Sequence, residues 1–417
     1  MTVLIAGGGI AGLTLALTCH EIGVPFKVFE ATSSIQPLGV GINLQPNAVR
    51  ELGDLGLTGE LERIGVKTQE LAFFSKKGLE IWSEPRGTWA GYAWPQFSVH
   101  RGQLQMLLYR TLTQRAGADC VQTGWRASSF ANEDGQACLT LLQAGGGEER
   151  VERGAVLIGA DGIHSAIRAQ MQPDEGPPLW GGAIMWRGTT LAKPFRTGAS
   201  MVMIGHDTQR LVAYPISAPK AESGLAVINW IAELRFDPHA GWHKEDWNRL
   251  ADADDFLPEF SAWRYDWLDL PALISGAEQV FEYPMVDRDP LERWTHGRVT
   301  LMGDAAHATY PVGSNGGSQA IVDARKLGAA FLQHGLTPAA LQAYESELRP
   351  ITTQVILANR GSGPDAILQV VEDRCGGEFT DIEEVLPRSE LEAHAAKYKG
   401  LAGLAIAALN RAPRTIT

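Results

Sequence analysis

The sequence contains few cysteines and has no excess of positive charge. Its four cysteines are scattered among 417 residues, and no two of them form a C-x-x-C pair. This spacing favours buried, reduced thiols over a zinc site or a disulfide framework, so we expect no metal. The net charge is −12, and an acidic surface repels phosphate backbones. Nucleic acid is therefore excluded as an expected partner.

Long apolar runs are also scarce. The first 20 residues carry no charged side chain, but they lack a basic leading region, and four glycines interrupt them. A strand followed by a helix explains these residues better than a signal peptide or a membrane span. We therefore expect a cytoplasmic protein without a membrane partner, either a monomer or a homodimer.

The composition that remains is that of an ordinary globular protein. Hydrophobic residues make up 45% of the chain and charged residues 20%. The length is sufficient for two or three domains. From about residue 180 to 284, short alternating apolar runs separated by turn residues predict one mostly antiparallel sheet.

A glycine-rich turn follows the first expected strand, residues 3–6. It fits the pattern G-x-G-x-x-G with Gly7, Gly9 and Gly12. The first glycine permits the tight turn, the second lets a pyrophosphate approach the backbone, and the third lets the helix pack close to the strand. Glu30 ends the next strand, where an acidic side chain accepts hydrogen bonds from ribose hydroxyls. The unit predicts a dinucleotide site.

Two further motifs follow expected strands. Asp161 lies in Gly-Ala-Asp-Gly after a strand over residues 155–158, and Asp304 follows Gly303 after a strand over residues 299–302. A carboxylate at the carboxyl end of a strand makes strong, charge-assisted hydrogen bonds to hydroxyl groups. In isolation each aspartate would be read as a turn or cap residue. Together with the glycine turn, both favour ligand binding.

These three ordered motifs resemble those of the group A flavin aromatic hydroxylases, the class of para-hydroxybenzoate and salicylate hydroxylases. The resemblance covers most of residues 1–360 and is strongest to the phenazine-oxidising branch. Salicylate hydroxylases often carry an acidic pair before the helix, Glu-Asp-Ala, whereas this chain has Val322, Asp323 and Ala324. The departure weakens a salicylate assignment and favours a phenazine-like one.

The resemblance implies an α/β fold with an α+β insert: a Rossmann-like FAD-binding domain, an antiparallel-sheet substrate domain and a C-terminal helical segment. The expected boundaries are 1–70, 98–175 and 285–360 for the discontinuous FAD domain, 71–97 and 176–284 for the substrate domain, and 361–417 for the helical tail. It also implies bound FAD and transient NADH or NADPH. The implied cofactor-binding residues are Gly7, Gly9, Ala11, Gly12, Glu30, Arg101, Asp161, Asp304, Gly313, Asn315, Gly316 and Gly317.

The implied reaction is hydroxylation of an electron-rich aromatic, with O2 activated as a hydroperoxide at flavin C4a. The substrate would be a phenazine-like or other aryl carboxylate, and CO2 would leave where the attacked carbon bears the carboxylate. The expected pocket walls are Trp186, Met203, Tyr214, Met285, Tyr310 and Pro311. Tyr214, His206 and Pro311 are the candidates for catalytic roles.

Some alternatives stay open on the sequence. Arg187 or Arg210 is a candidate to hold a carboxylate, although a surface ion pair explains either arginine as well. The enzyme could instead hydroxylate a one-ring salicylate or hydroxybenzoate. A nicotinamide-dependent dehydrogenase without flavin would use the glycine turn alone and leave the settings of Asp161 and Asp304 unexplained.

Overall fold

In the computed structural model, which describes residues 1–237, 249–361 and 363–417, the first strand lies inside a six-stranded sheet. In spatial order the strands are β20 (Thr295–His296), β21 (Val299–Leu301), β12 (Val156–Gly159), β1 (Val3–Ala6), β2 (Phe26–Glu30) and β8 (Val121–Thr123). Every neighbouring pair is parallel except β20 with β21. Both faces of this sheet are covered, which is why β1 and β12 read as uninterrupted apolar runs.

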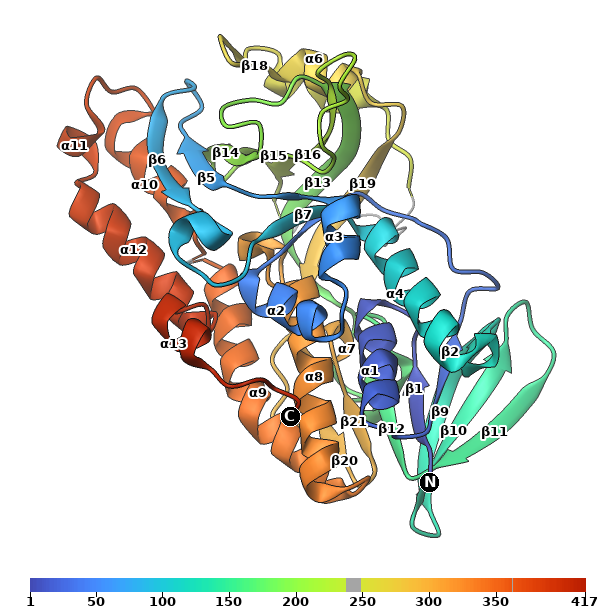
Figure 1. Ribbon diagram of the computed structural model, residues 1–417. Helices are drawn as coiled ribbons and strands as arrows, with labels where there is room; N and C mark the ends of the chain where they lie inside the picture. Colours follow the sequence, from blue (N-terminus) through green and yellow to red (C-terminus); the bar gives the residue numbers. More distant parts are fainter. Residues whose placement is uncertain (238–248, 362) are drawn as a thin grey trace.

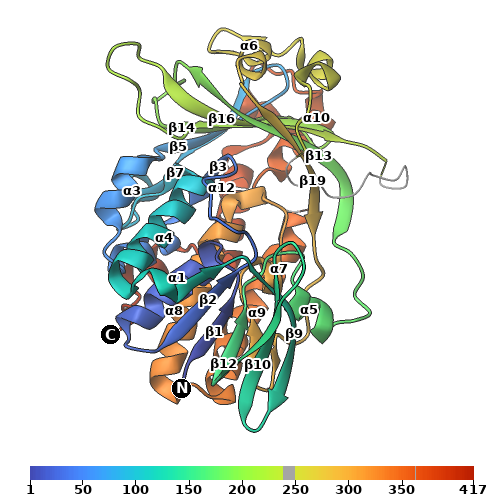
Figure 2. The same cartoon turned by 90° about the vertical axis from the view of Figure 1, so that its right-hand side faces the viewer.

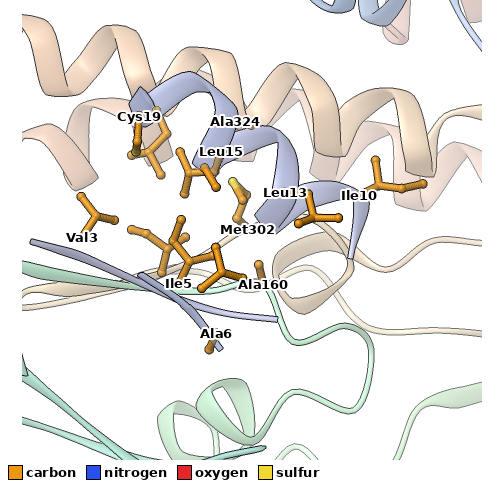
Figure 3. Close-up of a cluster of buried hydrophobic side chains, with 14 of the residues drawn as sticks. Val3, Ile5, Ala6, Ile10, Leu13, Leu15, Cys19, Ala160, Met302 and Ala324 are labelled. Atoms are coloured by element: carbon orange, nitrogen blue, oxygen red, sulfur yellow. The ribbon is translucent and has the colours of Figure 1, made fainter. Parts of the chain in front are cut away.

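Helices cover one face of the parallel sheet, and a small antiparallel sheet covers the other (Figure 2). The helices are α1 (Ile10–Glu21), α4 (Arg101–Ala116), α8 (Gly316–His334) and α9 (Pro338–Asn359). The small sheet consists of β9 (Trp125–Glu133), β10 (Gln136–Gln143) and β11 (Glu149–Gly154). Figure 3 shows apolar side chains of α1, such as Leu13, packed between Ile5 of β1 and Ala324 of α8. This core fixes the position of the glycine turn between β1 and α1.

A second, seven-stranded sheet lies above the first domain in Figure 2. Its strands in spatial order are β19 (Val280–Asp287), β13 (Leu179–Ala192), β16 (Ala226–Arg235), β15 (Gln209–Pro215), β14 (Ser200–His206), β5 (Glu70–Phe74) and β6 (Glu80–Pro85). All neighbours are antiparallel except β14 with β5. The α/β class and the mostly antiparallel second sheet expected from the sequence are therefore confirmed.

The two faces of this second sheet bury different clusters. The outer face packs against α6 (Leu270–Ser275), the short strands β17 (Arg264–Tyr265) and β18 (Leu268–Asp269), and an aromatic group that includes Phe256 and Trp263. The inner face presents a second cluster that includes Met201, Met203 and Tyr214. Successive side chains of a strand point to opposite faces, so only every second residue of each strand can contact a ligand on the inner face.

A short three-stranded sheet connects the two large sheets. It consists of β3 (Gly41–Leu44), β7 (Phe97–His100) and β4 (Gly65–Lys67), and α2 (Pro46–Asp54) and α3 (Thr58–Ile64) flank it. The Gly41 amide donates to Asn229 Oδ1 of the second sheet at 2.7 Å. Gln45 Nε2, just after β3, donates to the Gly313 carbonyl at 3.1 Å. The segment thus ties the second sheet to the loop that precedes α8.

The C-terminal helices run along one side of the molecule, from the second sheet down to the first domain (Figure 1). They are α10 (Ala366–Cys375), α11 (Ile382–Val385), α12 (Arg388–Leu401) and α13 (Ile406–Arg411). Apolar residues of α10 and α12, such as Leu368 and Leu391, complete the inner-face cluster of the sheet. Beyond α13, Thr415 Oγ1 donates to Glu51 of α2 at 2.7 Å. None of the helices in the described ranges is long and apolar enough to cross a membrane.

Candidate functional site

The expected cofactor features lie at one edge of the parallel sheet. The strands β21, β12, β1 and β2 are neighbours in that order. Asp304 follows β21, Asp161 follows β12, the glycine turn follows β1 and Glu30 ends β2. Because parallel strands end at the same edge, segments far apart in the sequence meet there.

The geometry of the glycine turn fits a pyrophosphate. Gly7 has a φ of +108°, and a Cβ added to it would lie 2.3 Å from the Ala160 carbonyl oxygen. A Cβ on Gly12 would lie 2.0 Å from the Gly7 carbonyl oxygen, so only glycine allows α1 to pack this close to β1. Next to Gly9 nothing lies within 4 Å of an added Cβ. The open side of the turn is thus at the second glycine, where a phosphate would approach the backbone.

The start of α1 offers donors to that space. The first hydrogen bond of the helix runs from the Leu13 amide to the Gly9 carbonyl at 3.0 Å, and Gly9 provides no side-chain cap. The amides of the first turn, including that of Ala11, and the positive end of the helix dipole can therefore act on an anion. Gln105 Nε2 of α4 donates to the Gly8 carbonyl at 2.9 Å and holds the turn from outside.

Glu30 is held beside the turn by three donors. Its Oε2 accepts from the Gly8 amide at 2.7 Å, and its Oε1 accepts from the amide and hydroxyl of Thr32 at 2.8 and 2.9 Å. A carboxylate has about four lone-pair sites. The side chain is therefore fixed in place and retains acceptor capacity for ribose hydroxyls.

Both carboxylate oxygens of Asp161 accept hydrogen bonds from nearby residues of the chain. Its Oδ1 accepts from the Ser165 hydroxyl at 2.6 Å, and its Oδ2 accepts from the Ala166 amide at 2.8 Å, at the start of α5 (Ala166–Met171). Burial raises the pKa of Asp161, and these hydrogen bonds oppose the rise. The structure thus shows the capping role that the sequence also allowed. A role of Asp161 towards FAD or nicotinamide stays a prediction.

Asp304 is exposed at the start of the short helix α7 (Asp304–His307). It follows Gly303, whose φ is +61° and whose amide donates to Asp323 Oδ2 at 3.0 Å. The same carboxylate oxygen pairs with His307 Nε2 at 2.5 Å. A Cβ on Gly316 would lie 3.9 Å from Asp304 Oδ1, so the carboxylate lies beside the first turn of α8. This position suits hydroxyl recognition.

The loop over residues 311–317 leads into that same helix. Gly313 has a φ of +73°, and α8 begins at Gly316 and Gly317 with no side-chain cap. Asn315 is buried, and its Nδ2 donates to the Tyr398 hydroxyl of α12 at 2.5 Å. No local sequence pattern points to Tyr398 or Gln45, because both act through contacts between distant segments. The helix end that points into this loop favours negative charge.

Arg101 begins α4 and is exposed. A Cβ on Gly39 would lie 3.7 Å from Arg101 Cδ, so the arginine lies against the loop that precedes β3. Its charge also acts on Arg187 and Tyr283 of the second sheet. Arg101 is therefore placed between the glycine turn's domain and the inner face of the second sheet.

Arg187 projects from β13 towards the inner face of the second sheet. Its Nη2 donates to the Gly41 carbonyl at 2.8 Å, it hydrogen-bonds Tyr214, and its Cζ lies 5.8 Å from the Tyr283 ring centroid. Among the described residues no carboxylate pairs with it, and its buried Nε has no acceptor. Burial lowers the pKa of Arg187, the nearby Arg101 adds to this, and the tyrosines oppose it.

Trp186, the neighbour of Arg187, does not line this face, contrary to the expectation. Its ring stacks on Phe256 at 4.6 Å between centroids, and its Nε1 donates to Glu282 at 3.0 Å on the outer face. Side chains alternate along a strand, so Met185 takes the inner position instead. Met185 clusters there with Met285 and, at its margin, Tyr310.

Of the candidates for catalytic roles, Tyr214 lies on the inner face and His206 lies apart. Burial raises the pKa of Tyr214 to about 12, with Arg187 opposing, so its hydroxyl stays protonated near neutral pH. It can donate or accept a hydrogen bond but is a poor base. His206 ends β14 at the turn into β15, beside Glu372 and Lys76. It is five residues along β14 from Met201, about 16 Å at ~3.3 Å per residue.

Pro311 is exposed at the beginning of the 311–317 loop. The carbonyl of Tyr310 before it accepts from Asn359 Nδ2 at 3.2 Å. Pro311 therefore follows a residue at the margin of the Met285 cluster, and its proposed roles as a pocket wall and in catalysis stay predictions.

Arg210 has an internal partner. It makes a bidentate pair with Glu233, its Nη2 lying 2.7 and 2.8 Å from the two carboxylate oxygens, and it also pairs with Asp365 at the start of α10. All three side chains are buried. Of the two arginines considered from the sequence, Arg210 is thus held in an internal ion pair. Arg187 is the one that pairs with no carboxylate among the described residues.

A cavity opens between the inner face and the C-terminal helices. Its empty space is about 740 Å³, which includes solvent at its mouth. The sheet contributes Phe73, Met201 and Met203, and the loop before α8 contributes Gly313 and Ser314. Of the expected wall residues, Met203 is among those that line this cavity, and Tyr214 packs in the same apolar cluster as Met203.

Comparison with known proteins agrees with this geometry. Residues 1–359 match the family of FAD binding domains. The phenazine 1,6-dicarboxylic acid hydroxylase PhzS of Lysobacter antibioticus is 44% identical over 361 residues, 86% of this chain and 89% of the relative. The aurachin C monooxygenase/isomerase of Stigmatella aurantiaca is 32% identical over 350 residues, 83% and 84% of the two chains. A solved salicylate hydroxylase substrate complex has the same fold, with a TM-score of 0.74, 22% identity and coverage of 99% and 97%.

Proposed function

Since the chain belongs to the FAD-binding family and is an FAD-dependent aromatic hydroxylase, we propose that its substrate is a fused-ring aromatic carboxylate of the phenazine type. The observation that carries the proposal is the largely apolar cavity between the inner face of the second sheet and the 311–317 loop. Pockets for flat organic ligands combine apolar walls with a few placed polar groups. The similarity to a phenazine dicarboxylate hydroxylase supports the same substrate class.

Bound FAD would supply electron transfer from NAD(P)H to O2 and transfer of one oxygen atom to the ring. The net reaction converts Ar–H, O2, NAD(P)H and H⁺ into Ar–OH, H2O and NAD(P)⁺. Where the attacked carbon bears the carboxyl group, CO2 leaves in place of the ring proton.

The chain's own residues bind and orient both ligands. The glycine turn, Glu30 and Asp304 hold the FAD pyrophosphate and its hydroxyls, and the start of α8 favours negative charge at the flavin. Met203, Tyr214, Met285, Tyr310 and Pro311 stay the proposed pocket walls, with Met185 in place of Trp186. These walls exclude water from the reacting ring.

A substrate panel tests this proposal. The purified yellow holoenzyme is mixed with NADH or NADPH and, in turn, phenazine carboxylates, salicylates, anthranilates and quinolones. We expect nicotinamide oxidation to accelerate with phenazine carboxylates, and the product mass to show either one added oxygen or exchange of CO2 for oxygen. Acceleration only with one-ring acids would contradict the fused-ring assignment and favour the salicylate-type alternative.

A further inference from the structure

One end of the cavity differs from its apolar walls. Arg86 and Trp82 from the β6 region, Gln96 just before β7 and Lys399 from α12 all line this end. Segments from both ends of the sequence meet here, and α12 lies beyond residue 359, where the family match ends. The C-terminal helices therefore contribute to this cavity from outside the range of the family match.

Two cations share one carboxylate at this end. Arg86 Nη1 donates to Glu84 Oε1 at 2.7 Å, and Lys399 Nζ donates to Glu84 Oε2 at 2.6 Å. The cluster therefore keeps one positive charge in a protein whose net charge is −12. The Arg86 charge reaches the hydroxyls of Tyr92 and Tyr398, which also line the cavity and whose pKa values burial raises.

Two buried donors at the same end have no acceptor among the residues that the structure describes. Gln96 is 1% exposed, and its Oε1 accepts from Arg86 Nε at 2.9 Å. This bond fixes which atom of the amide is oxygen, so the Nε2 atom is the one left without a partner. Trp82 Nε1 is likewise buried without a partner. Buried donors without acceptors are costly and rare in folded proteins, and a ligand that supplies acceptors resolves them.

We propose that this end of the cavity, formed by Arg86, Gln96 and Lys399, recognises the carboxylate of the aromatic substrate. The inference rests on the proposed function and adds the groups that select an anionic substrate. A carboxylate supplies two acceptor oxygens and the negative charge that the cluster lacks, and arginine binds it with charge-assisted hydrogen bonds. The ring system then extends along Met201 and Met203 towards Gly313.

The test compares phenazine-1-carboxylate with phenazine-1-carboxamide, which has the same shape without the charge. Binding to the holoenzyme is followed by the change in the flavin absorption spectrum, so no turnover is needed. The wild type should bind the carboxylate at least about ten-fold more tightly than the amide, since hydrogen bonds to charged groups are worth about 1.5–3 kcal/mol. Arg86→Gln should remove most of this preference, because it weakens carboxylate binding more than carboxamide binding, and the FAD content shows whether the variant is folded.

Three further variants and the wild type decide among the outcomes. Arg374→Gln is the control: it removes an exposed ion pair between α10 and Glu390 of α12. It should keep the preference for the carboxylate over the carboxamide. Lys399→Gln should reduce it less than Arg86→Gln. Loss of the preference in Arg187→Gln but not in Arg86→Gln would place the carboxylate at Arg187 and overturn the inference. Equal binding of acid and amide by the wild type overturns the inference alone, and no binding of either overturns the proposed substrate class as well.

Discussion

At the scale of single residues, the site depends on side chains that fix the backbone around the cofactor's expected position. Asp323 is one of them, because a single carboxylate oxygen holds both the Gly303 amide and His307. Its other oxygen accepts from Gln319 at 3.0 Å. The loop that presents Asp304 is therefore tied to the interior of α8 by one buried carboxylate.

The His307–Asp323 pair predicts a pH-dependent stability. Burial lowers the pKa of His307, but the charge and hydrogen bond of Asp323 outweigh burial, and the pKa lies above its ordinary value. A raised folded-state pKa means that the stabilisation is complete below the unfolded pKa of about 6.5 and is lost as pH rises through the folded-state pKa. We expect His307→Gln to cost about 1.5–3 kcal/mol at low pH, with a difference from wild type that shrinks as pH rises. Thermal unfolding of both proteins across this pH range measures it.

His334 provides the matched control, since it is exposed in the last turn of α8. His334→Gln should unfold like the wild type at every pH. A gap between the wild type and His307→Gln that stays constant with pH would contradict a charged pair.

The residue scale also shows what the sequence could predict. The placement of Gly7, Gly9, Gly12 and Glu30 was predictable because it follows from a local strand-turn-helix pattern, and the close approach at Gly12 agrees with that pattern. Their roles towards FAD stay a prediction. Trp186 was assigned to the wrong face, because both faces of the second sheet are buried. Apolar residues at consecutive positions of β13 carry no information about which of them faces inward.

At the scale of elements, α12 supports the 311–317 loop. The Tyr398 hydroxyl accepts from Asn315 Nδ2 at 2.5 Å and donates to Asn359 Oδ1 at 2.8 Å. Asn359 Nδ2 in turn donates to Thr309 Oγ1 at 3.0 Å. One hydroxyl from the C-terminal segment therefore connects the loop, through Asn315, to the end of α9, and Asn359 extends this link to Thr309 just before the loop.

Tyr398→Phe should weaken FAD binding as well as the fold. Without the hydroxyl, the Asn315 and Asn359 amides lose a partner in a buried place, which costs about 1–3 kcal/mol. Part of that cost falls on the conformation of the loop, so we expect FAD affinity to fall about three- to ten-fold in a titration of apoprotein by flavin fluorescence.

Tyr265→Phe removes a half-buried hydroxyl at the outer-face cluster of the second sheet, one that donates to the Lys76 carbonyl at 2.9 Å. It should lower the unfolding temperature without changing FAD affinity. Equal FAD affinities for the wild type and Tyr398→Phe would refute the role of α12 in holding the loop.

At the scale of the whole molecule, the C-terminal segment joins the second sheet to the first domain and lines the cavity. The sequence indicated only a helical tail over residues 361–417, because nothing local reveals where an amphipathic helix docks. In the structure this segment covers the inner-face cluster of the second sheet, lines the cavity with Lys399 and returns to α2. The cavity end formed by Arg86, Gln96 and Lys399 was equally inaccessible to sequence reasoning, since it joins residues from opposite ends of the chain.

Arg210 is the charged link between the second sheet and this segment, and its replacement should destabilise the whole protein. Arg210→Met leaves Glu233 and Asp365 as buried carboxylates without their cation, and breaking a buried pair typically costs about 3–5 kcal/mol. A large fall in the denaturant midpoint is expected. The carboxylate-over-carboxamide preference should persist in the protein that stays folded, because Arg210 already has internal partners.

The double variant Arg210→Met/Glu233→Leu separates charge from packing. It removes one of the two stranded carboxylates along with the cation, so it should recover part of the lost stability. A double variant no more stable than Arg210→Met would mean that the arginine stabilises the molecule by packing α10 against the sheet. A selective loss of carboxylate binding in Arg210→Met would instead move this residue from the framework to the substrate site.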